Sequence, residues 1–330
     1  MRFRTELIIP ESKRKIQHSQ SIFGVGSCFV NEIGEKISDS KFRTLLNPFG
    51  TLFHPLAIEN ALLRILSLTY YTQGEIFKNE ELYFSWDHHT SFDRISMERT
   101  LQHINSELEK ANEFIQKADV FILTFGSAWV YKLKETGLFV ANCHKVPGSL
   151  FRKTLLNDSE IRQSLKNCFH LIQDVNPNAH IIATISPVRH VKDGITANML
   201  SKAKLISNLH EVLKTFEKVD YFPAYELLID DLRDYRFYKP DLVHPNEQAV
   251  DYIWNKFSET YFDAATTEKI QLANDIQNAL NHRPLNPETI AYKEFLYKTN
   301  KQLAAMENQF PKGSFTNEKQ VLQKLMKYAD

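Results

Sequence analysis

The segment Ser21-Ile22-Phe23-Gly24-Val25-Gly26-Ser27-Cys28-Phe29 decides the fold of this chain. It opens with β-branched and aromatic residues, which favour a strand, and then passes into a run of small residues. A helical pattern of apolar residues follows over residues 31–38. The segment therefore predicts a strand, a tight turn and a helix, with Ser27 at the carboxyl end of the strand.

The same alternation of strand and helix continues along the chain. It predicts strands at 41–46, 120–125, 180–185 and 219–222, and helices at 55–68, 97–118, 159–175, 201–216 and 246–262. Such a chain forms right-handed βαβ units and a parallel sheet that is covered on both faces. We therefore predict a three-layer α/β/α domain over residues 1–262, interrupted by hairpins at 75–92 and 130–141. Residues 263–330 are polar and helix-rich, and predict a C-terminal extension that serves as a lid or an interface.

The composition is that of a folded globular protein. The 330 residues include 40 Lys and Arg against 40 Asp and Glu, and 43% are hydrophobic, which excludes a disordered chain. The net charge is zero, so the chain lacks the excess of basic residues that is typical of a dedicated nucleic-acid binder. No stretch approaches the ~18 apolar residues of a membrane span, and three cysteines are too few for a disulfide framework. We expect a cytoplasmic protein that binds neither nucleic acid nor membranes.

Ser27 is the first candidate for chemistry. At the end of a strand and the start of a helix, its hydroxyl would lie near backbone N–H groups that can bind a developing oxyanion. The alternative is an ordinary helix N-cap serine, which is a common role for this residue type. A phosphate-binding loop is the weaker interpretation, because the segment lacks both G-x-G-x-x-G and the Walker Gly-Lys-Ser pattern.

Asp241 and His244 form the second candidate, within Asp241-Leu242-Val243-His244-Pro245. On a loop that enters a helix, His244 can act as a general base while Asp241 accepts its other ring N–H and fixes the tautomer. The alternative is a loop aspartate beside a helix-capping histidine. Ser27 and this pair are far apart in the sequence, yet both are predicted to lie on loops at the edge of one sheet.

Several segments together resemble the GSCFA family, which is assigned to the SGNH/GDSL hydrolase superfamily. Gly26-Ser27-Cys28-Phe29 matches the motif that names the family, with Val30 in place of its alanine. Similar blocks are found at residues 47–50, 124–127, 142–147, 186–190, 232–238 and 241–245. The resemblance implies a flavodoxin-like core and an ester hydrolase that needs no metal or organic cofactor.

The resemblance also implies roles for single residues. Ser27 would be the nucleophile, His244 the base and Asp241 its orienting partner, with the N–H groups of Ser27 and Gly50 holding the oxyanion. The superfamily usually adds an asparagine after the third strand, where this chain has Ala128. Asn142 or Ser127 is the nearest replacement, and loss of one such donor typically slows turnover by ~10²–10³.

Other polar and aromatic residues near the predicted edge are candidates for contact with the substrate. They are His88, His89, Trp129, His144 and His190. A packed, hydrogen-bonded role is the alternative for each histidine. Cys28 is interpreted as a small hydrophobic residue, because neighbouring positions point in different directions.

We predict that the chain cleaves an acyl ester, an acetyl ester being one candidate, on a small molecule or a carbohydrate. Acyl transfer to a carbohydrate hydroxyl would use the same triad and remains an alternative. A binding module that has kept the fold and lost turnover is a third interpretation, motivated by Ala128.

Overall fold

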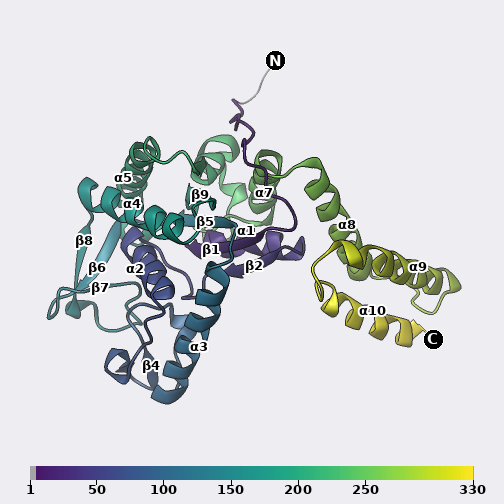
Figure 1. Ribbon diagram of the computed structural model, residues 1–330, viewed down its shortest axis with the longest axis horizontal. Coiled ribbons are helices and arrows are strands. Elements are labelled where there is room, and N and C mark those ends of the chain that lie inside the picture. Colours follow the sequence, from purple (N-terminus) through teal and green to yellow (C-terminus); the bar gives the residue numbers. More distant parts are fainter. Residues whose placement is uncertain (1–4, 330) are drawn as a thin grey trace.

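Five parallel strands form the central sheet of the computed structural model, which describes residues 5–329. Their spatial order is β10-β9-β5-β1-β2 (Figure 1). Counted along the chain, this is the order 2-1-3-4-5 of flavodoxin-like folds. The predicted three-layer α/β/α architecture is therefore confirmed. The strands are β1 (Ser21–Gly26), β2 (Arg43–Leu46), β5 (Val120–Phe125), β9 (His180–Ile185) and β10 (Val219–Phe222).

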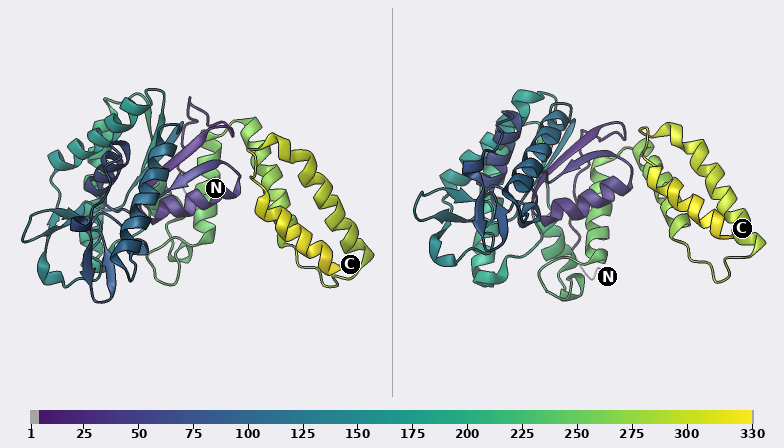
Figure 2. Two further views of the ribbon diagram at one scale, coloured as in Figure 1. Left: turned by 60° about the horizontal axis from the view of Figure 1, so that its bottom comes forward. Right: turned by 90° about the horizontal axis from the view of Figure 1, so that it is seen from below.

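Alternate side chains of the central strands enter two different cores. Ile22 and Ile122 pack beneath the helices of one face, whereas Phe23 and Leu123 pack beneath those of the other. Both faces of the sheet are covered, as is usual for parallel sheets. Figures 1 and 2 show the resulting layers. The first face carries α1 (Cys28–Asp39) and α7 (Glu247–Tyr261), and the second carries α2 (Pro55–Leu66), α3 (Met97–Ile115), α4 (Asp158–Val175) and α5 (Ile195–Leu213).

Two small antiparallel sheets interrupt the central pattern. The first is the hairpin of β3 (Phe77–Asn79) and β4 (Leu82–Phe84), within the segment predicted as a hairpin. The second pairs β6 (Trp129–Leu133) with β7 (Phe139–Val140), and β8 (Phe151–Leu155) adds a third strand beside β6. The sequence did not predict β8, because Arg152 and Lys153 follow each other and hide the alternation of an edge strand.

The domain also contains short helices, and several elements begin at other residues than the sequence predicted. After β10 the chain forms α6 (Ala224–Glu226) and a π-helical turn over Leu227–Leu232. Helix α1 begins at Cys28, three residues before the predicted pattern, and α5 begins at Ile195, six residues before it. β2 begins at Arg43, after Lys41 has turned the chain with a φ of 65°.

The C-terminal extension is a bundle of α8 (Ala264–Asn281), α9 (Ile290–Met306) and α10 (Thr316–Ala329). Its own core includes Ile276, Leu303 and Phe315, and Figure 2 shows it projecting away from the sheet. Lys41 Nζ lies 2.5 Å from Glu318 Oε1, and the His18 N–H donates to Thr266 Oγ1 at 3.1 Å. His18 and Lys41 precede β1 and β2, so these contacts lie at the amino ends of the strands. Ser27 lies at the opposite edge of the sheet.

None of the helices within residues 5–329 is both long and apolar enough to cross a membrane.

Candidate active site

Ser27 follows β1 and occupies the N-cap position of α1, but its side chain does not cap the helix. Its backbone N–H donates to Thr124 O at 3.0 Å, which extends the pairing of β1 with β5. Ser27 is 1% exposed, and its Oγ has no hydrogen-bond partner within residues 5–329. A buried polar group without a partner costs about 1–3 kcal/mol. The structure therefore does not support the N-cap interpretation.

The turn that presents Ser27 is fixed by Gly26 and Asn47. Gly26 has a φ of 143°, and a Cβ at this position would lie 2.2 Å from Thr124 O, so only glycine fits. The Gly26 N–H donates to Asn47 Oδ1 at 2.8 Å. Asn47 Nδ2 in turn donates to Asn31 Oδ1 on α1 at 2.7 Å. The Asn47 side chain therefore ties the end of β1 to the helix that follows it.

Gly50 lies in the neighbouring turn, where its N–H is already used. It donates to Asn47 O at 2.7 Å, and Gly50 has a φ of 72°. A Cβ at Gly50 would stand 2.4 Å from the His89 Cβ, so the loop that carries His89 packs directly on this turn. The two backbone donors proposed from the sequence, those of Ser27 and Gly50, thus both have carbonyl acceptors in this structure.

Asp241 and His244 form the pair that the sequence spacing suggested. Asp241 Oδ2 lies 2.7 Å from His244 Nδ1, and Oδ1 accepts the N–H groups of His244 and Val243 at 3.0 and 2.9 Å. Hydrogen bonds from the backbone N–H groups of His244 and Val243, and then from the His244 ring, lower the pKa of Asp241 to about 2. The carboxylate is therefore ionised at neutral pH, and it holds the ring with Nε2 directed away from Asp241.

The loop that carries His244 is attached to two elements at the carboxyl edge of the sheet. The Arg189 N–H, in the loop after β9, donates to Val243 O at 3.2 Å. Lys239 Nζ lies 2.9 Å from Glu32 Oε1 on α1, the helix that begins after Ser27. These contacts bring His244 to the same region as Ser27, although no hydrogen bond joins the two side chains.

His190 lies beside Ser27. A Cβ built on Gly126 would stand 3.3 Å from His190 Nε2 and 3.3 Å from the Ser27 Cβ, so the missing side chain of Gly126 leaves room for both. His190 Nε2 is buried and has no hydrogen-bond partner within the described part of the chain. Burial, together with nearby Lys202 and His244, lowers the pKa of His190 to about 3. This imidazole is therefore neutral at neutral pH.

The other candidate donors make contacts elsewhere. Ser127 Oγ lies 3.3 Å from Ser201 Oγ and accepts the Trp129 N–H at 3.0 Å. Asn142 Oδ1 accepts the His144 N–H at 2.9 Å, within its own loop. Trp129 donates from Nε1 to Ala197 O at 3.2 Å. Ser127 and Trp129 thus connect β5 and β6 to α5.

Three further histidines belong to a packed loop region. The His88 ring is 0% exposed and stacks on Phe49 with centroids 4.3 Å apart. The His89 side chain caps the short helix that follows it, and Nδ1 lies 3.1 Å from Ser91 Oγ. His144 is also buried, stacked on Phe84 at 4.2 Å. Among the five residues predicted to contact the substrate, His190 lies beside Ser27.

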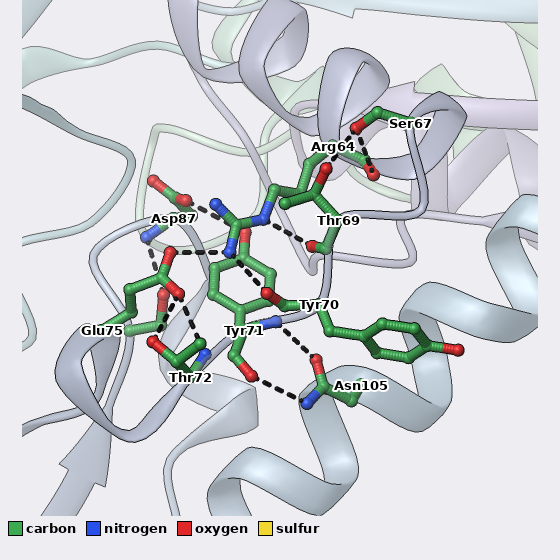
Figure 3. A network of polar contacts seen from close by, with 10 residues as sticks. Arg64, Ser67, Thr69, Tyr70, Tyr71, Thr72, Glu75, Asp87 and Asn105 are labelled. Carbon is green, nitrogen blue, oxygen red and sulfur yellow. Dashed lines mark hydrogen bonds and ion pairs between the residues drawn. The ribbon is translucent and has the colours of Figure 1, made fainter.

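A cavity of about 560 Å³ opens next to this region, between α2 and the two small sheets. Trp86, Asp87, Tyr71 and His54 are among its lining residues. Tyr71 donates to Asp87 Oδ2 at 2.9 Å, and Arg64 lies over the Tyr71 ring, as Figure 3 shows. His54 follows Phe53, whose carbonyl accepts the Gly126 N–H at 2.8 Å. His54 therefore lines the cavity, and the residue before it, Phe53, contacts Gly126 beside Ser27.

Lys202 is a site residue that the sequence did not suggest. It is 1% exposed, and Nζ donates to Gly126 O at 2.8 Å and to Ser186 O at 2.6 Å. Burial lowers the pKa of Lys202 to about 7. One feature of the sequence could have pointed to it. The buried face of α5 includes Leu205 and Leu209, and it continues toward the start of the helix with the polar residues Asn198, Ser201 and Lys202.

Cys28 is adjacent to Ser27 but is not activated. Burial raises the pKa of its thiol, so the thiolate that nucleophilic attack requires is disfavoured. Within residues 5–329, no three His, Cys, Asp or Glu side chains are grouped as they would be to hold a metal ion.

Comparisons with solved structures match carbohydrate esterases at low identity. A carbohydrate esterase family 3 protein from Talaromyces cellulolyticus is 10% identical, with a TM-score of 0.35, over 78% of this chain and 99% of that one. A family 3 carbohydrate esterase from Clostridium thermocellum is 14% identical, with a TM-score of 0.32, over 77% and 98% of the two chains. No curated protein matches this chain.

Family models match most of the sequence. The GSCFA family model covers residues 21–257, which include Ser27, His190, Asp241 and His244. A second model, that of the C-terminal domain of GSCFA domain proteins, covers residues 273–328 within the helical extension. The chain therefore belongs to the GSCFA family.

Proposed function

We propose that this protein is a serine-dependent ester hydrolase. The observation that carries the proposal is the Ser27 hydroxyl, which is buried without a partner in the described part of the chain, at the edge of the sheet where open α/β folds bind their ligands. The Asp241–His244 pair supports it, because its loop is attached at the same edge. A serine, a histidine and a carboxylate in these roles are the working parts of nucleophilic acyl transfer.

In the proposed reaction, Ser27 Oγ attacks the acyl carbonyl carbon and its proton passes to His244 Nε2. The carbonyl oxygen becomes an oxyanion. When this intermediate collapses, the bond to the alcohol oxygen breaks and His244 returns the proton to the leaving alcohol. Water then attacks the acyl-serine with His244 again as base, which releases the acid and restores Ser27.

Asp241 enables His244 to act as the base in this reaction. Its contact with Nδ1 favours the tautomer in which Nε2 is free to accept a proton. Its negative charge also stabilises the imidazolium that forms when the proton arrives. Because Ser27 is 1% exposed, an ester reaches it only after the surrounding loops move.

We propose short acyl esters, such as acetyl esters on a small molecule or a carbohydrate, as substrates. Hydrolysis of p-nitrophenyl acetate and of an acetylated sugar should be measured for the wild type and for Ser27→Ala. Turnover that the substitution abolishes would support the proposal. Equal rates for the two proteins would contradict it, since exposed nucleophiles elsewhere would then account for any release of acetate.

One observation favours a second candidate, a binding module without turnover. The N–H groups of Ser27 and Gly50 both donate to backbone carbonyls, so neither is free for an oxyanion in this conformation. A binding module would take up an acetylated sugar in a calorimeter and leave it intact. A hydrolase would release acetate from the same sample.

A further inference from the structure

His190 and Ser27 both lie beside Gly126, and each carries a buried polar atom without a hydrogen-bond partner within the described residues. Ser27 Oγ and His190 Nε2 are both buried without hydrogen bonds within residues 5–329. Both residues lie 3.3 Å from the point where a Gly126 Cβ would stand. Most buried polar groups in proteins are satisfied, so two unsatisfied ones beside the same glycine mark a candidate place for a polar atom of the substrate.

The proposed chemistry at Ser27 indicates which atom of the substrate would lie in the space beside Gly126. When a serine attacks an ester, negative charge develops on the carbonyl oxygen beside the serine, and it needs hydrogen-bond donors in place. The Ser27 and Gly50 N–H groups are both engaged, at 3.0 and 2.7 Å from their acceptors. Ala128 has no side-chain donor, and Ser127 and Asn142 bond within their own surroundings.

We propose that His190 Nε2–H is the side-chain donor to the oxyanion formed at Ser27. This inference rests on the proposed function. In this role His190 donates a hydrogen bond and transfers no proton, while His244 remains the base. A neutral imidazole is suited to such a role, because it polarises a carbonyl without exchanging its proton.

The surroundings of His190 keep it in that state. Burial and the nearby Lys202 and His244 disfavour the imidazolium, since they lower the pKa of His190 to about 3. A general base works best with a pKa near the operating pH, so His190 is poorly suited to take the proton of Ser27. The His190 N–H also donates to Asn198 Oδ1 at 2.9 Å, which fixes the backbone from which the ring extends.

The test compares two substitutions of similar size. His190→Gln places an amide N–H near the position of Nε2, whereas His190→Leu fills the space without a donor. We expect His190→Leu to lower kcat by ~10²–10³ with little change in KM, and His190→Gln to recover at least about tenfold of that loss. His210→Leu, at a ring that packs against Tyr221 on the far end of α5, serves as the control and should leave kcat unchanged.

Two further measurements separate donation from a structural role. The acid limb of the pH–rate profile should stay where it is in His190→Gln, because a group that donates a hydrogen bond and transfers no proton adds no titration to that profile. Circular dichroism melting of each variant shows whether it is folded, and His190→Gln is the informative variant if His190→Leu unfolds.

The outcomes are distinct. An active wild type with His190→Leu at full kcat would overturn this inference and leave the proposed function intact. Equal loss of activity in both variants, with both folded, would show that an N–H donor at this position does not restore catalysis and would also overturn it. A wild type that neither hydrolyses esters nor reacts at Ser27 would overturn the proposed function, and this inference with it.

Discussion

Asp241 holds His244 with both of its carboxylate oxygens: Oδ2 contacts the ring at Nδ1 and Oδ1 accepts the His244 backbone N–H. The two contacts use different atoms of His244, so the carboxylate fixes the backbone and the ring together. Leu242 between them has a φ of 57°, which closes the short loop. The spacing of three residues in the sequence therefore lets one short loop supply both members of the pair.

Asp241→Asn is expected to lower kcat by about 10²-fold or more, because the amide no longer stabilises the imidazolium and can favour the wrong tautomer. Asp241 is partly exposed, so the loss should be smaller than the ~10⁴ typical of a buried aspartate. Steady-state hydrolysis of p-nitrophenyl acetate measures it. Asp234→Asn, at the start of another short helix, is the matched control. Equal kcat values for Asp241→Asn and the wild type would remove Asp241 from the mechanism.

Gly126→Ala should lower activity more than stability. The new methyl group would lie 3.2–3.3 Å from Phe53 O, His190 Nε2 and the Ser27 Cβ, so it occupies the space between the serine and the histidine. We expect kcat to fall by at least about tenfold, because small displacements of reacting groups are costly. Gly148→Ala, where nothing lies within 4 Å of the added methyl, is the control and should be neutral. If both variants kept wild-type kcat, no reacting group would occupy that space.

Asn47→Ala is expected to destabilise the fold by about 1–3 kcal/mol, because the buried Gly26 N–H loses its acceptor. Urea denaturation followed by fluorescence measures the change. Asn178→Ala, at an exposed turn before β9, should change the free energy of unfolding much less. A stability for Asn47→Ala that matches that of Asn178→Ala would show that the Asn47 side chain is not needed to hold the turn before Ser27.

Lys202 makes stability depend on pH in the alkaline range. Burial lowers its pKa to about 7, whereas the unfolded chain keeps the ordinary value of 10.5. Between these values the unfolded state binds one more proton than the folded state, so raising the pH stabilises the fold. Over this range the contribution is at most about 1.4 kcal/mol per pH unit.

Lys202→Met removes this contribution. The free energy of unfolding should therefore rise less between pH 7 and pH 10 in the variant than in the wild type, as measured by urea denaturation at each pH. Two curves with the same slope over that range would mean that Lys202 stays charged in the folded protein.

Much of the fold follows from the local sequence. The strand at 21–26 is a continuous apolar run that ends in small residues. Such runs predict the parallel strands, and apolar residues at helical spacing predict the helices between them. The Asp241–His244 pair was also predictable, since both partners lie in one short loop. The edge strand β8 was not, because it is recognised only through its pairing with β6.

The environment of Ser27 depends on long-range contacts that no local pattern encodes. The backbone N–H of Ser27 donates to Thr124 O, which lies on β5, a strand far from Ser27 in the sequence. The position of His190 against Ser27 depends on Gly126, on another strand, and on Arg189 bonding to the loop of His244. Lys202 is hidden for the same reason, because its partners are two carbonyls at the ends of β5 and β9.

The central claim is that Ser27 is a nucleophile activated by His244. The most direct measurement treats the native protein with a fluorophosphonate probe and locates the adduct by peptide mass mapping, in parallel with His244→Ala. The account predicts an adduct at Ser27 in the wild type that is lost or strongly slowed in the variant. Absence of an adduct at Ser27 in the folded wild type, or equal labelling of both proteins, would contradict it.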